Sequence, residues 1–368
     1  MTERAVIPAE SRFRRALYAL PFLAITALMT RAFGMAEPIG PIIEEMVKTS
    51  VFTTSSANIP IIKGFYGIPV LDGIFNVVTV AFANLQFYFD EKAYWQSLVF
   101  LTDFAGMYAV VQLEAYRPGN TFIISKYPVV FLFVSQMIAI GCTAPIFFFL
   151  AYVFTPAYKL TTPSLGRLSV GTCKAIYVAI ILGYYVPHFP SYFNASLERR
   201  NWWNWIWQLF PVWCCSITFA FSKVFARMNK SNGKLNPERD ALRILMGGCS
   251  VLSMGVWWYT VASMKGSIFE VFVPQYLITY PQEPSLGLRT VIQFDYICCY
   301  AAGYMWLAYH FRDLEKVGVC SISWVRAISV TVVLGFLVGP GTLFPILWLL
   351  REELLMAANG EEMKEARD

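Results

Sequence analysis

Long, unbroken apolar segments dominate this chain. They recur from one end to the other, and the 368 residues are 57% hydrophobic but only 14% charged. Soluble domains carry about 25% charged residues, so a soluble core could not bury this much apolar surface. In a bilayer every backbone polar group needs an internal partner, which leaves helices or closed barrels. Because the runs are continuous and about 20 residues long, we expect an all-α, polytopic integral membrane bundle of about eight or nine transmembrane helices.

The apolar runs define a single membrane domain, residues 1–368, whose last part, 351–368, is a charged C-terminal tail. We expect spans at about 16–35, 69–88, 95–116, 128–153, 169–187, 203–225, 243–264, 289–310 and 325–350. The fourth and ninth are longer than a bilayer needs and contain prolines, Pro145 in one and Pro340 and Pro345 in the other. We expect kinks or breaks in both. The sequence shows no recognisable repeat and no pair of broken helices of the transporter kind.

Lysine and arginine in the loops predict the orientation. They are more frequent on the side that carries the N-terminal Arg12, Arg14 and Arg15. We therefore expect the N-terminus in the cytoplasm, and the endoplasmic reticulum as the membrane. The net charge of +5 is modest and spread over the loops, so we expect no nucleic acid as a partner. The apolar runs make the lipid bilayer the expected partner. No sequence feature indicates the oligomeric state.

Several reaction types have no motif here. The two histidines, His188 and His310, do not stand in a metal-ligand spacing. The phosphate-binding glycine loop and the dinucleotide fingerprint are missing, as are the acidic motifs that chelate magnesium around a prenyl diphosphate. We therefore expect neither a metal nor a cofactor.

Acidic side chains inside the spans are the main candidates for function. Each costs at least about 2.5 kcal/mol on insertion scales, and the candidates are Asp72, Asp103, Glu114 and Asp295. Asp72 begins the second span, where Asn76 and Thr79 extend it into a polar stripe. An aspartate that caps the start of its own helix explains the same pattern.

The third span carries two of these acids. Asp103 and Glu114 are eleven residues apart, so they share one helix face at a separation of about 16 Å. Glu114 can pair with Arg117, which would make it a poor acid, and Gln112 and Asn120 are candidate hydrogen-bond partners. Asp103 has no charged partner in its own helix. Desolvation favours its protonated form at neutral pH, which is the form that a general acid requires.

Aromatic residues surround the fourth acid, Asp295. Tyr296, Tyr300 and Tyr304 form a stripe at helical spacing, and Trp306 follows. Aromatic faces stabilise cations, so a dry aromatic cavity with one or two acids would suit carbocation chemistry. The same cavity would suit the binding of a lipid.

Six short stretches carry a family resemblance: Gly67–Gly73, Trp95–Leu98, Leu113–Asn120, Pro145–Leu150 with Thr155-Pro156, Tyr185–Pro190 and Trp207–Pro211. The most specific is Glu114-Ala-Tyr-Arg117-Pro-Gly119-Asn120 at the end of a span. These stretches resemble fungal membrane-bound terpene cyclases of the ascofuranone and ascochlorin type, which make meroterpenoid secondary metabolites.

The resemblance implies a metal-independent cyclase. Its substrate would be a prenylated aromatic polyketide, and the enzyme would close the (epoxy)farnesyl chain after protonating an epoxide or an alkene. Glu114, Asp72, Asp103 and Asp295 are the candidate catalytic acids. The expected substrate-binding residues are Arg117, Asn120, Gln112, Asn76, Tyr300 and Trp306. A proton-coupled lipid or small-molecule transporter remains an alternative, as does a scaffolding protein whose acids merely form ion pairs.

Overall fold

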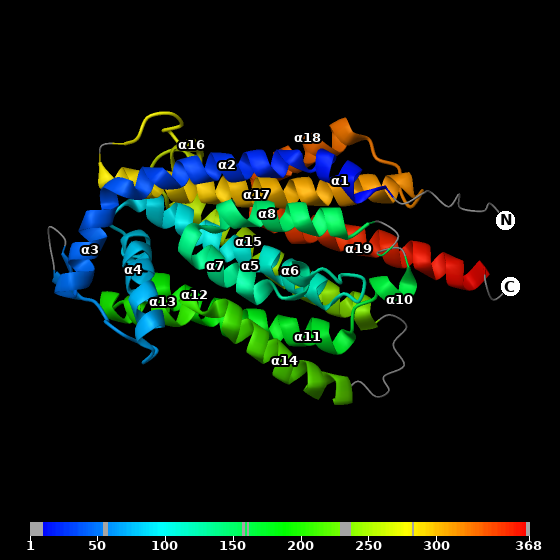
Figure 1. Cartoon of the computed structure of the whole chain (residues 1–368), viewed down its shortest axis with the longest axis horizontal. Helices are drawn as coiled ribbons and strands as arrows, with labels where there is room; N and C mark the ends of the chain where they lie inside the picture. The colour runs from blue at the N-terminus through cyan, green and yellow to red at the C-terminus, as the bar shows by residue number, and fades with distance from the viewer. Residues whose placement is uncertain are drawn as a thin grey trace.

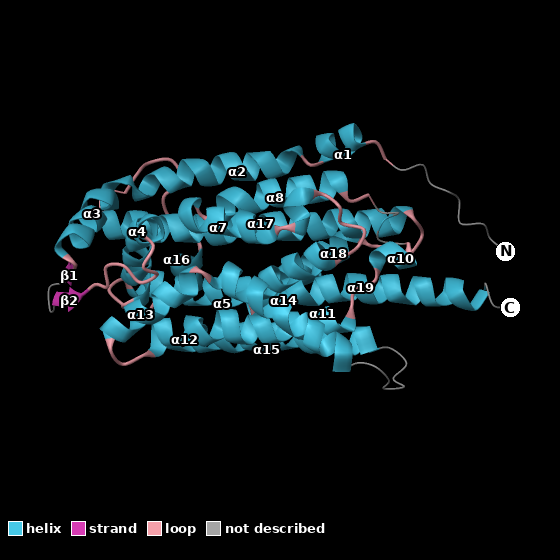
Figure 2. Cartoon of the chain, turned by 60° about the horizontal axis from the view of Figure 1, so that its bottom comes forward, coloured by secondary structure: helices cyan, strands magenta, loops and turns pink. Residues whose placement is uncertain are grey.

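The computed structural model describes residues 10–53, 58–156, 159, 162–228, 237–281 and 283–365. These residues are helical apart from connecting loops and one short antiparallel pair, β1 (Val51–Thr53) and β2 (Asn58–Pro60). Figure 2 shows the two strands at one end of the molecule, beside α3. The expectation of an all-helical chain is therefore confirmed.

The first half of the chain holds α1 (Arg12–Tyr18), α2 (Leu20–Phe33), the 3₁₀-helix η1 (Gly34–Ile39), α3 (Gly40–Thr49), α4 (Pro69–Gln86), α5 (Glu91–Tyr116), α6 (Ile123–Lys126), α7 (Pro128–Ile138), α8 (Ile140–Phe154), α10 (Pro163–Gly166) and α11 (Val170–Ala179). The second half holds the π-helix η2 (Ile180–Tyr185), α12 (Val186–Phe193), α13 (Leu197–Gln208), α14 (Phe210–Met228), α15 (Pro237–Ser263), α16 (Ile268–Phe272), α17 (Pro284–Lys316), α18 (Trp324–Val338) and α19 (Pro340–Glu365).

Four helical segments of the described chain are long and apolar enough to cross a membrane: Leu20–Thr49, Glu91–Tyr116, Val170–Phe193 and Pro237–Ser263. Helices α13 and α14 meet at a bend of 58° and would together make a fifth. Our count of eight or nine spans is not confirmed. One physical reason is that the expected spans 128–153 and 325–350 are not single helices. Each is broken into two shorter ones.

The first broken segment is a helical hairpin formed by α7 and α8. Its turn is Ala139, with φ 71° and ψ 142°. Phe131 and Phe147, eight residues before and after the turn, have ring centroids 4.9 Å apart. The segment that leads into α7 also meets the end of α8, where Phe122 stacks on Phe154. The chain therefore enters the bundle, turns, and returns to the same end. The break that we expected lies at Ala139 and not at Pro145.

The second broken segment, α18 and α19, turns in the same way. Gly339 has φ 85° and ψ 142°, and Pro340 begins the next helix. An apolar cavity of about 860 Å³ is lined by residues of both arms, α18 and α19. Every side chain of α18 is at least partly exposed.

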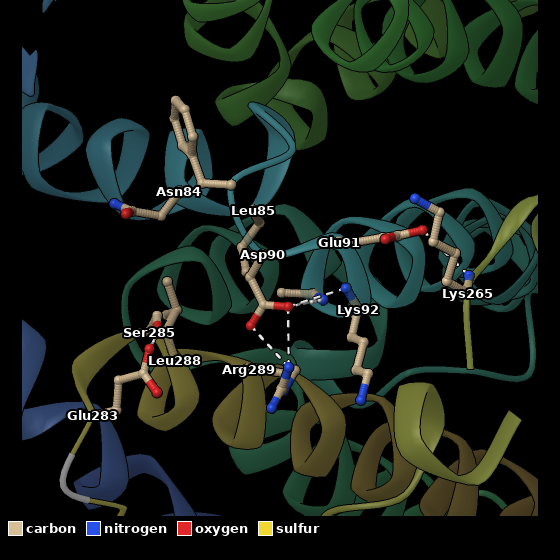
Figure 3. Close-up of a pocket in the computed structure, with 12 residues that line it drawn as sticks. Asn84, Leu85, Asp90, Glu91, Lys92, Lys265, Glu283, Ser285, Leu288 and Arg289 are labelled. Carbon is tan, nitrogen blue, oxygen red and sulfur yellow. Dashed lines mark hydrogen bonds and ion pairs between the residues drawn. The ribbon is translucent and has the colours of Figure 1, made fainter. Parts of the chain in front are cut away.

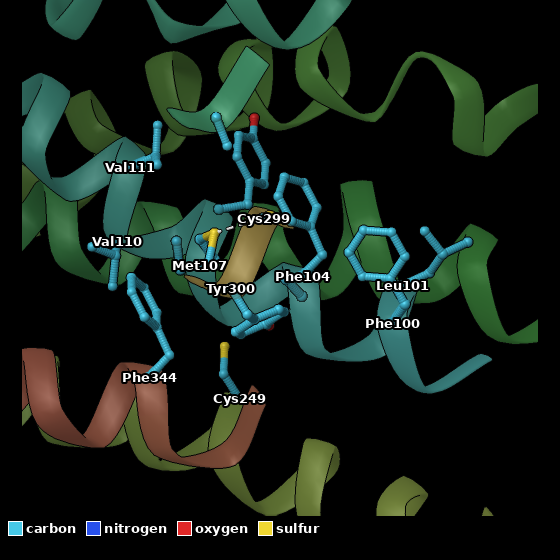
Figure 4. Packing of buried hydrophobic residues seen from close by; sticks show 14 of the residues in the cluster. Phe100, Leu101, Phe104, Met107, Val110, Val111, Cys249, Cys299, Tyr300 and Phe344 are labelled. Carbon is cyan, nitrogen blue, oxygen red and sulfur yellow. Dashed lines mark hydrogen bonds between the residues drawn. The ribbon is translucent and has the colours of Figure 1, made fainter. Parts of the chain in front are cut away.

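Two long helices, α5 and α17, form the centre of the bundle. They run in the same direction, away from the end that holds α3 (Figure 1). An ion pair of 3.1 Å between Asp90 and Arg289 joins their beginnings. Figure 4 shows the buried packing between α5, α15, α17 and α19 around Met107, Cys249, Tyr300 and Phe344. The most apolar stretch of the central helix α5 is completely buried.

Candidate functional site

Asp103 lies where four helices meet. Its carboxyl group accepts hydrogen bonds from Ser253 of α15, from Tyr296 of α17 (2.7 Å), and from the backbone N–H of Gly341 in the first turn of α19. The side chain is 1% exposed. The N-terminus of a helix favours a negative charge, because its first N–H groups are free to donate. The structure therefore supplies Asp103 with partners that its own helix lacks.

An apolar cavity of about 860 Å³ lies beside this cluster. It is bounded by α16, α17, α18 and α19, and Trp257 of α15 contributes to its wall. Tyr296 belongs both to the cavity wall and to the hydrogen-bond partners of Asp103. Pockets for small molecules commonly occupy about 300–1,000 Å³ and are mostly apolar with a few polar groups. The size and lining of this cavity match that description.

Asp295 has a simpler environment. It accepts a hydrogen bond from the backbone N–H of Gly141 in the first turn of α8. A Cβ added to Gly141 would lie 2.8 Å from the Asp295 carboxyl oxygen, so the close approach needs a glycine here. Asp295 thus caps the start of α8 from another helix. The structure does not bring it together with Asp103 in one polar cluster.

Glu114 lies in a buried ion cluster at the other end of α5. Arg117 donates to it at 3.0 Å, which is the predicted pair, and Arg351 of α19 donates at 2.5 Å. Trp348 and Asn120 add hydrogen bonds of 3.0 Å and 2.9 Å. Glu352 balances the second arginine, because its carboxylate accepts from Arg117 at 2.8 Å and from Arg351 at 2.5 Å. Two acids and two arginines therefore neutralise each other, which favours an ionised, structural Glu114.

A small cavity borders this cluster, with room for about one water molecule. Its volume is about 10 Å³, and Glu114, Asn120, Trp306 and His310 are among the residues that line it. The Trp306 ring packs edge-on against His310 at a centroid distance of 4.4 Å. Neither ring nitrogen of His310 has a partner among the described residues. Trp306 is therefore a wall residue here and lies outside the wall of the large apolar cavity.

The polar stripe of α4 does not join these clusters. Asp72 accepts hydrogen bonds from the backbone N–H groups of Phe65 (2.9 Å) and Tyr66 (2.8 Å), and so closes the loop that precedes its own helix. The bond from Tyr66 is the largest of the effects that lower the pKa of Asp72. Asn76 is half-buried, and its side-chain oxygen has no partner among the described residues. Helix α4 has no side-chain cap at its N-terminus, so Asp72 fastens the preceding loop and does not cap its own helix as the capping interpretation expected.

The remaining predicted residues lie in the core. The side-chain amide of Gln112 donates to Tyr108 at 2.5 Å, and its oxygen accepts from Thr218 at 3.3 Å, so it does not bind Glu114. Tyr300 packs between Tyr296 and Tyr304, with centroid distances of 5.0 Å and 6.3 Å.

A second, polar pocket of about 430 Å³ lies at the end of the bundle where α5 and α17 begin (Figure 3). Asp90 caps α5, since its carboxylate accepts from the backbone of Lys92 and Ala93, and it also pairs with Arg289. Glu91 accepts from the backbone N–H of Lys265 at 3.2 Å. These charges are engaged in joining helix ends. Within the described part of the chain, no group of three or more metal-ligating side chains occurs.

Sequence reasoning missed Ser253 and Arg351, which complete the two acidic clusters. Ser253 is 150 residues from Asp103, and Arg351 is 237 residues from Glu114. A small hydroxyl in an apolar run gives no signal of its own. Arg351 did carry one, because it follows directly on a long apolar run that ends in Trp348, Leu349 and Leu350.

Comparisons with known proteins place the chain among fungal proteins. It is 24% identical over 352 residues to the FAD-dependent monooxygenase verC1 of Penicillium polonicum, a match that covers 94% of this chain and 43% of that protein. It is also 24% identical over 354 residues to the FAD-dependent monooxygenase anuJ of Penicillium roqueforti, covering 94% of this chain and 42% of the relative. The FAD-dependent monooxygenase BOA8 of Botryotinia fuckeliana is 24% identical over 252 residues, a match that covers 66% of this chain and 32% of that protein. The chain thus spans about two fifths of the length of the first two relatives. No solved structure matches it.

These names correct the predicted activity. The relatives are named for oxidation with FAD, so the prediction of a terpene cyclase, an enzyme of the isomerase or lyase type, is wrong. The error came from assigning a reaction to short motifs that the structure places in helix contacts, such as Glu114 with Arg117 and Asn120. The transporter alternative gains no support from the names either.

The family itself is clear from a match that extends over nearly the whole chain. Residues 15–356 match the CtvD domain, a range that contains α2, the α7–α8 hairpin, the two central helices α5 and α17, α18 and most of α19. The chain therefore belongs to the CtvD domain family.

Proposed function

We propose that this chain is a membrane domain that binds the lipophilic substrate of a flavin-dependent monooxygenation without holding the flavin itself. The relatives' names supply the oxidation. The observation that carries the proposal is the apolar cavity of about 860 Å³ between α16, α17, α18 and α19. Because α18 is exposed along its length, a lipophilic molecule could reach this cavity from the bilayer.

The residues of this chain do not fit FAD. Dinucleotide-binding folds use a parallel sheet and a glycine-rich turn at the start of a helix. In the described part of the chain the strands are β1 and β2, three residues each and antiparallel. The sequence lacks the fingerprint as well. We therefore assign the flavin to a partner or to a region outside this sequence, and no step of the chemistry to FAD here.

We also propose that the end of the bundle holding α1 and the last turns of α19 faces the cytosol, in the membrane of the endoplasmic reticulum. The helix ends at this side of the bundle (Figure 1) are those of α1, the end of α14, the start of α15 and the end of α17, and these segments carry the basic residues Arg12, Arg14, Lys223, Arg227, Arg239, Arg243, Arg312 and Lys316. Positive charge near membrane-spanning segments favours the cytosolic side. Labelling of single exposed cysteines introduced at Lys223 and Lys63, with the membrane intact or opened, would test this orientation.

The binding test uses the full chain in lipid nanodiscs. We expect saturable binding of a radiolabelled long-chain alkylphenol, and no flavin absorbance after incubation with FAD and desalting. Thr331→Phe should weaken binding by about tenfold, or about 1.4 kcal/mol, because Thr331 lines the cavity. The matched control is Val330→Phe, because the adjacent Val330 is 48% exposed and is not among the residues that line the cavity.

Two results would overturn this proposal. One is the absence of saturable binding to the wild-type chain. The other is tight retention of FAD, with oxidation of the ligand by this chain alone.

A further inference from the structure

Two sets of helices in the structure, called the two halves here, share one design that the sequence does not reveal, while α3, α4 and the helices from α11 to α14 lie outside both. Each half consists of a first helix, a long central helix and a helical hairpin. These are α2, α5 and α7–α8 in one half, and α15, α17 and α18–α19 in the other. The first helices, α2 and α15, are called the inward helices here. Helix α2 packs against α8 and α17, and in the same way α15 packs against α19 and α5. The central helices run in the same direction (Figure 1). Such parallel repeats are known in membrane proteins.

The correspondence holds residue by residue at the two hairpin turns. Ala139 and Gly339 share nearly the same backbone angles. Two residues later, Gly141 and Gly341 each donate a backbone N–H to the aspartate of the other half's central helix, Asp295 and Asp103.

Three residues after each turn, a backbone carbonyl accepts from a hydroxyl of the inward helix. Thr26 donates to Cys142 at 3.4 Å, and Ser250 donates to Thr342 at 3.1 Å. Thr26 and Ser250 therefore occupy equivalent positions, as do Asp295 and Asp103.

The two aspartates differ in what else they bind. Asp103 also accepts from Ser253, three residues after Ser250, and from Tyr296 at 2.7 Å. The equivalent positions near Asp295 are Met29, three residues after Thr26, and Phe104, the residue after Asp103. Both are apolar and buried. The hairpin turn at Ala139 is thus bound to Asp295 without any side-chain donor to that carboxyl group among the described residues. The need to bind a hairpin turn therefore does not explain why Asp103 has Ser253 and Tyr296 as additional donors.

The two additional donors, Ser253 and Tyr296, connect Asp103 to the wall of the large apolar cavity. Thr342 donates to Ser253 at 3.2 Å, Ser253 donates to Asp103, and Tyr296 donates to Asp103. Because the Tyr296 O–H is directed to the carboxylate, its oxygen lone pairs remain able to accept a hydrogen bond. Tyr296 also lines the apolar cavity.

We infer that Tyr296, held by Asp103 and Ser253, is the binding site for a hydroxyl group on an otherwise apolar ligand, an alcohol or a phenol. This inference rests on the proposed function, since it names the polar group that the cavity recognises. Tyr296 would be the contact residue, while Asp103 and Ser253 are positioning residues that fix its hydroxyl. Asp295 is the structural counterpart, without a role in recognition.

The test compares nonylphenol with its methyl ether and with nonylbenzene on the wild-type chain in nanodiscs. The phenol can donate to the Tyr296 oxygen and the two analogues cannot, so it should bind up to about tenfold more tightly than either, a difference of about 1.4 kcal/mol that lies within the usual contribution of one hydrogen bond. Tyr296→Phe should abolish this preference and leave the affinity for nonylbenzene unchanged. Ser253→Ala should reduce the preference in part.

Two controls make the result specific. Tyr304→Phe should keep the phenol preference, because Tyr304 lines the same cavity but donates to the carbonyl of Pro340. Asp295→Asn should keep it too. If Tyr296→Phe still prefers the phenol, the inference is wrong while the proposed function stands. If the wild-type chain binds none of the three compounds, the proposed function fails with it.

Discussion

Gly341 lies against the carboxyl group of Asp103 with no space between them for a methyl group. The contact joins the first turn of the last helix to the middle of the buried central helix α5. It also gives the carboxylate the backbone N–H of Gly341 as a donor. Packing and electrostatics therefore both depend on a glycine at this position.

Gly341→Ala should lower the free energy of unfolding by about 3 kcal/mol, because an overpacked core must shift backbone or side chains. Denaturation in mixed micelles, followed by tryptophan fluorescence, would measure it. Gly255→Ala in α15 is the matched control. A Cβ there meets nothing within 4 Å, and alanine favours helix by about 1 kcal/mol. Equal stabilities of the two variants would contradict the packing argument.

Substitutions at the two hairpin turns, Ala139→Gly and Gly339→Ala, should change the stability of the protein in opposite directions. Ala139 has φ 71° and ψ 142°, a conformation that L side chains rarely adopt. Ala139→Gly should therefore stabilise the protein by about 1 kcal/mol. Gly339→Ala should destabilise it, both through its φ of 85° and because a Cβ would lie 3.0 Å from the Trp257 ring. Thermal unfolding of both variants checks the signs, and stabilisation by Gly339→Ala would refute the argument.

The cluster around Glu114 should behave as a balanced set of charges. Glu114→Gln leaves one buried arginine charge without compensation, so we expect a loss of about 3–5 kcal/mol. The double variant Glu114→Gln, Arg351→Met keeps the Glu352–Arg117 pair of 2.8 Å and should recover much of that loss. Equilibrium unfolding of the single and double variants gives the coupling. Purely additive losses would show that charge balance is not what holds the cluster.

Acid should open the loop in front of α4. The hydrogen bonds from Tyr66 and Phe65 lower the pKa of Asp72 in the folded protein. Their contribution is therefore fully present above the unfolded value of about 3.9 and is lost as the pH falls through the lower, folded value. Hydrogen-exchange protection of the Phe65 and Tyr66 amides, corrected for intrinsic rates, should fall in that range. In Asp72→Asn it should show no such step.

Some contacts could be predicted because they are local. The Glu114–Arg117 pair follows from residues within one turn of the same helix. The breaks in the two longest apolar runs were also expected, since those runs exceed the bilayer. That each break makes a hairpin was not, because a hairpin and a span of the same length have the same hydropathy.

The site depended on contacts that no local pattern records. Asp103 looks unpartnered within α5, yet its donors come from α15, α17 and α19. The repeat was hidden for a related reason. The structural equivalence rests on backbone angles and on positions such as Ser250 and Thr26, which differ in residue type while making the same bond.

The exchange of aspartates between the halves has a consequence for synthesis. Helix α5 enters the membrane with Asp103 long before the helix that caps it has been made, since Gly341 is 238 residues further along the chain. Until then the acidic group lacks one of its three donors, and an acid inside a membrane is costly without partners. A chain that stops before α19 therefore leaves Asp103 without the backbone N–H of Gly341.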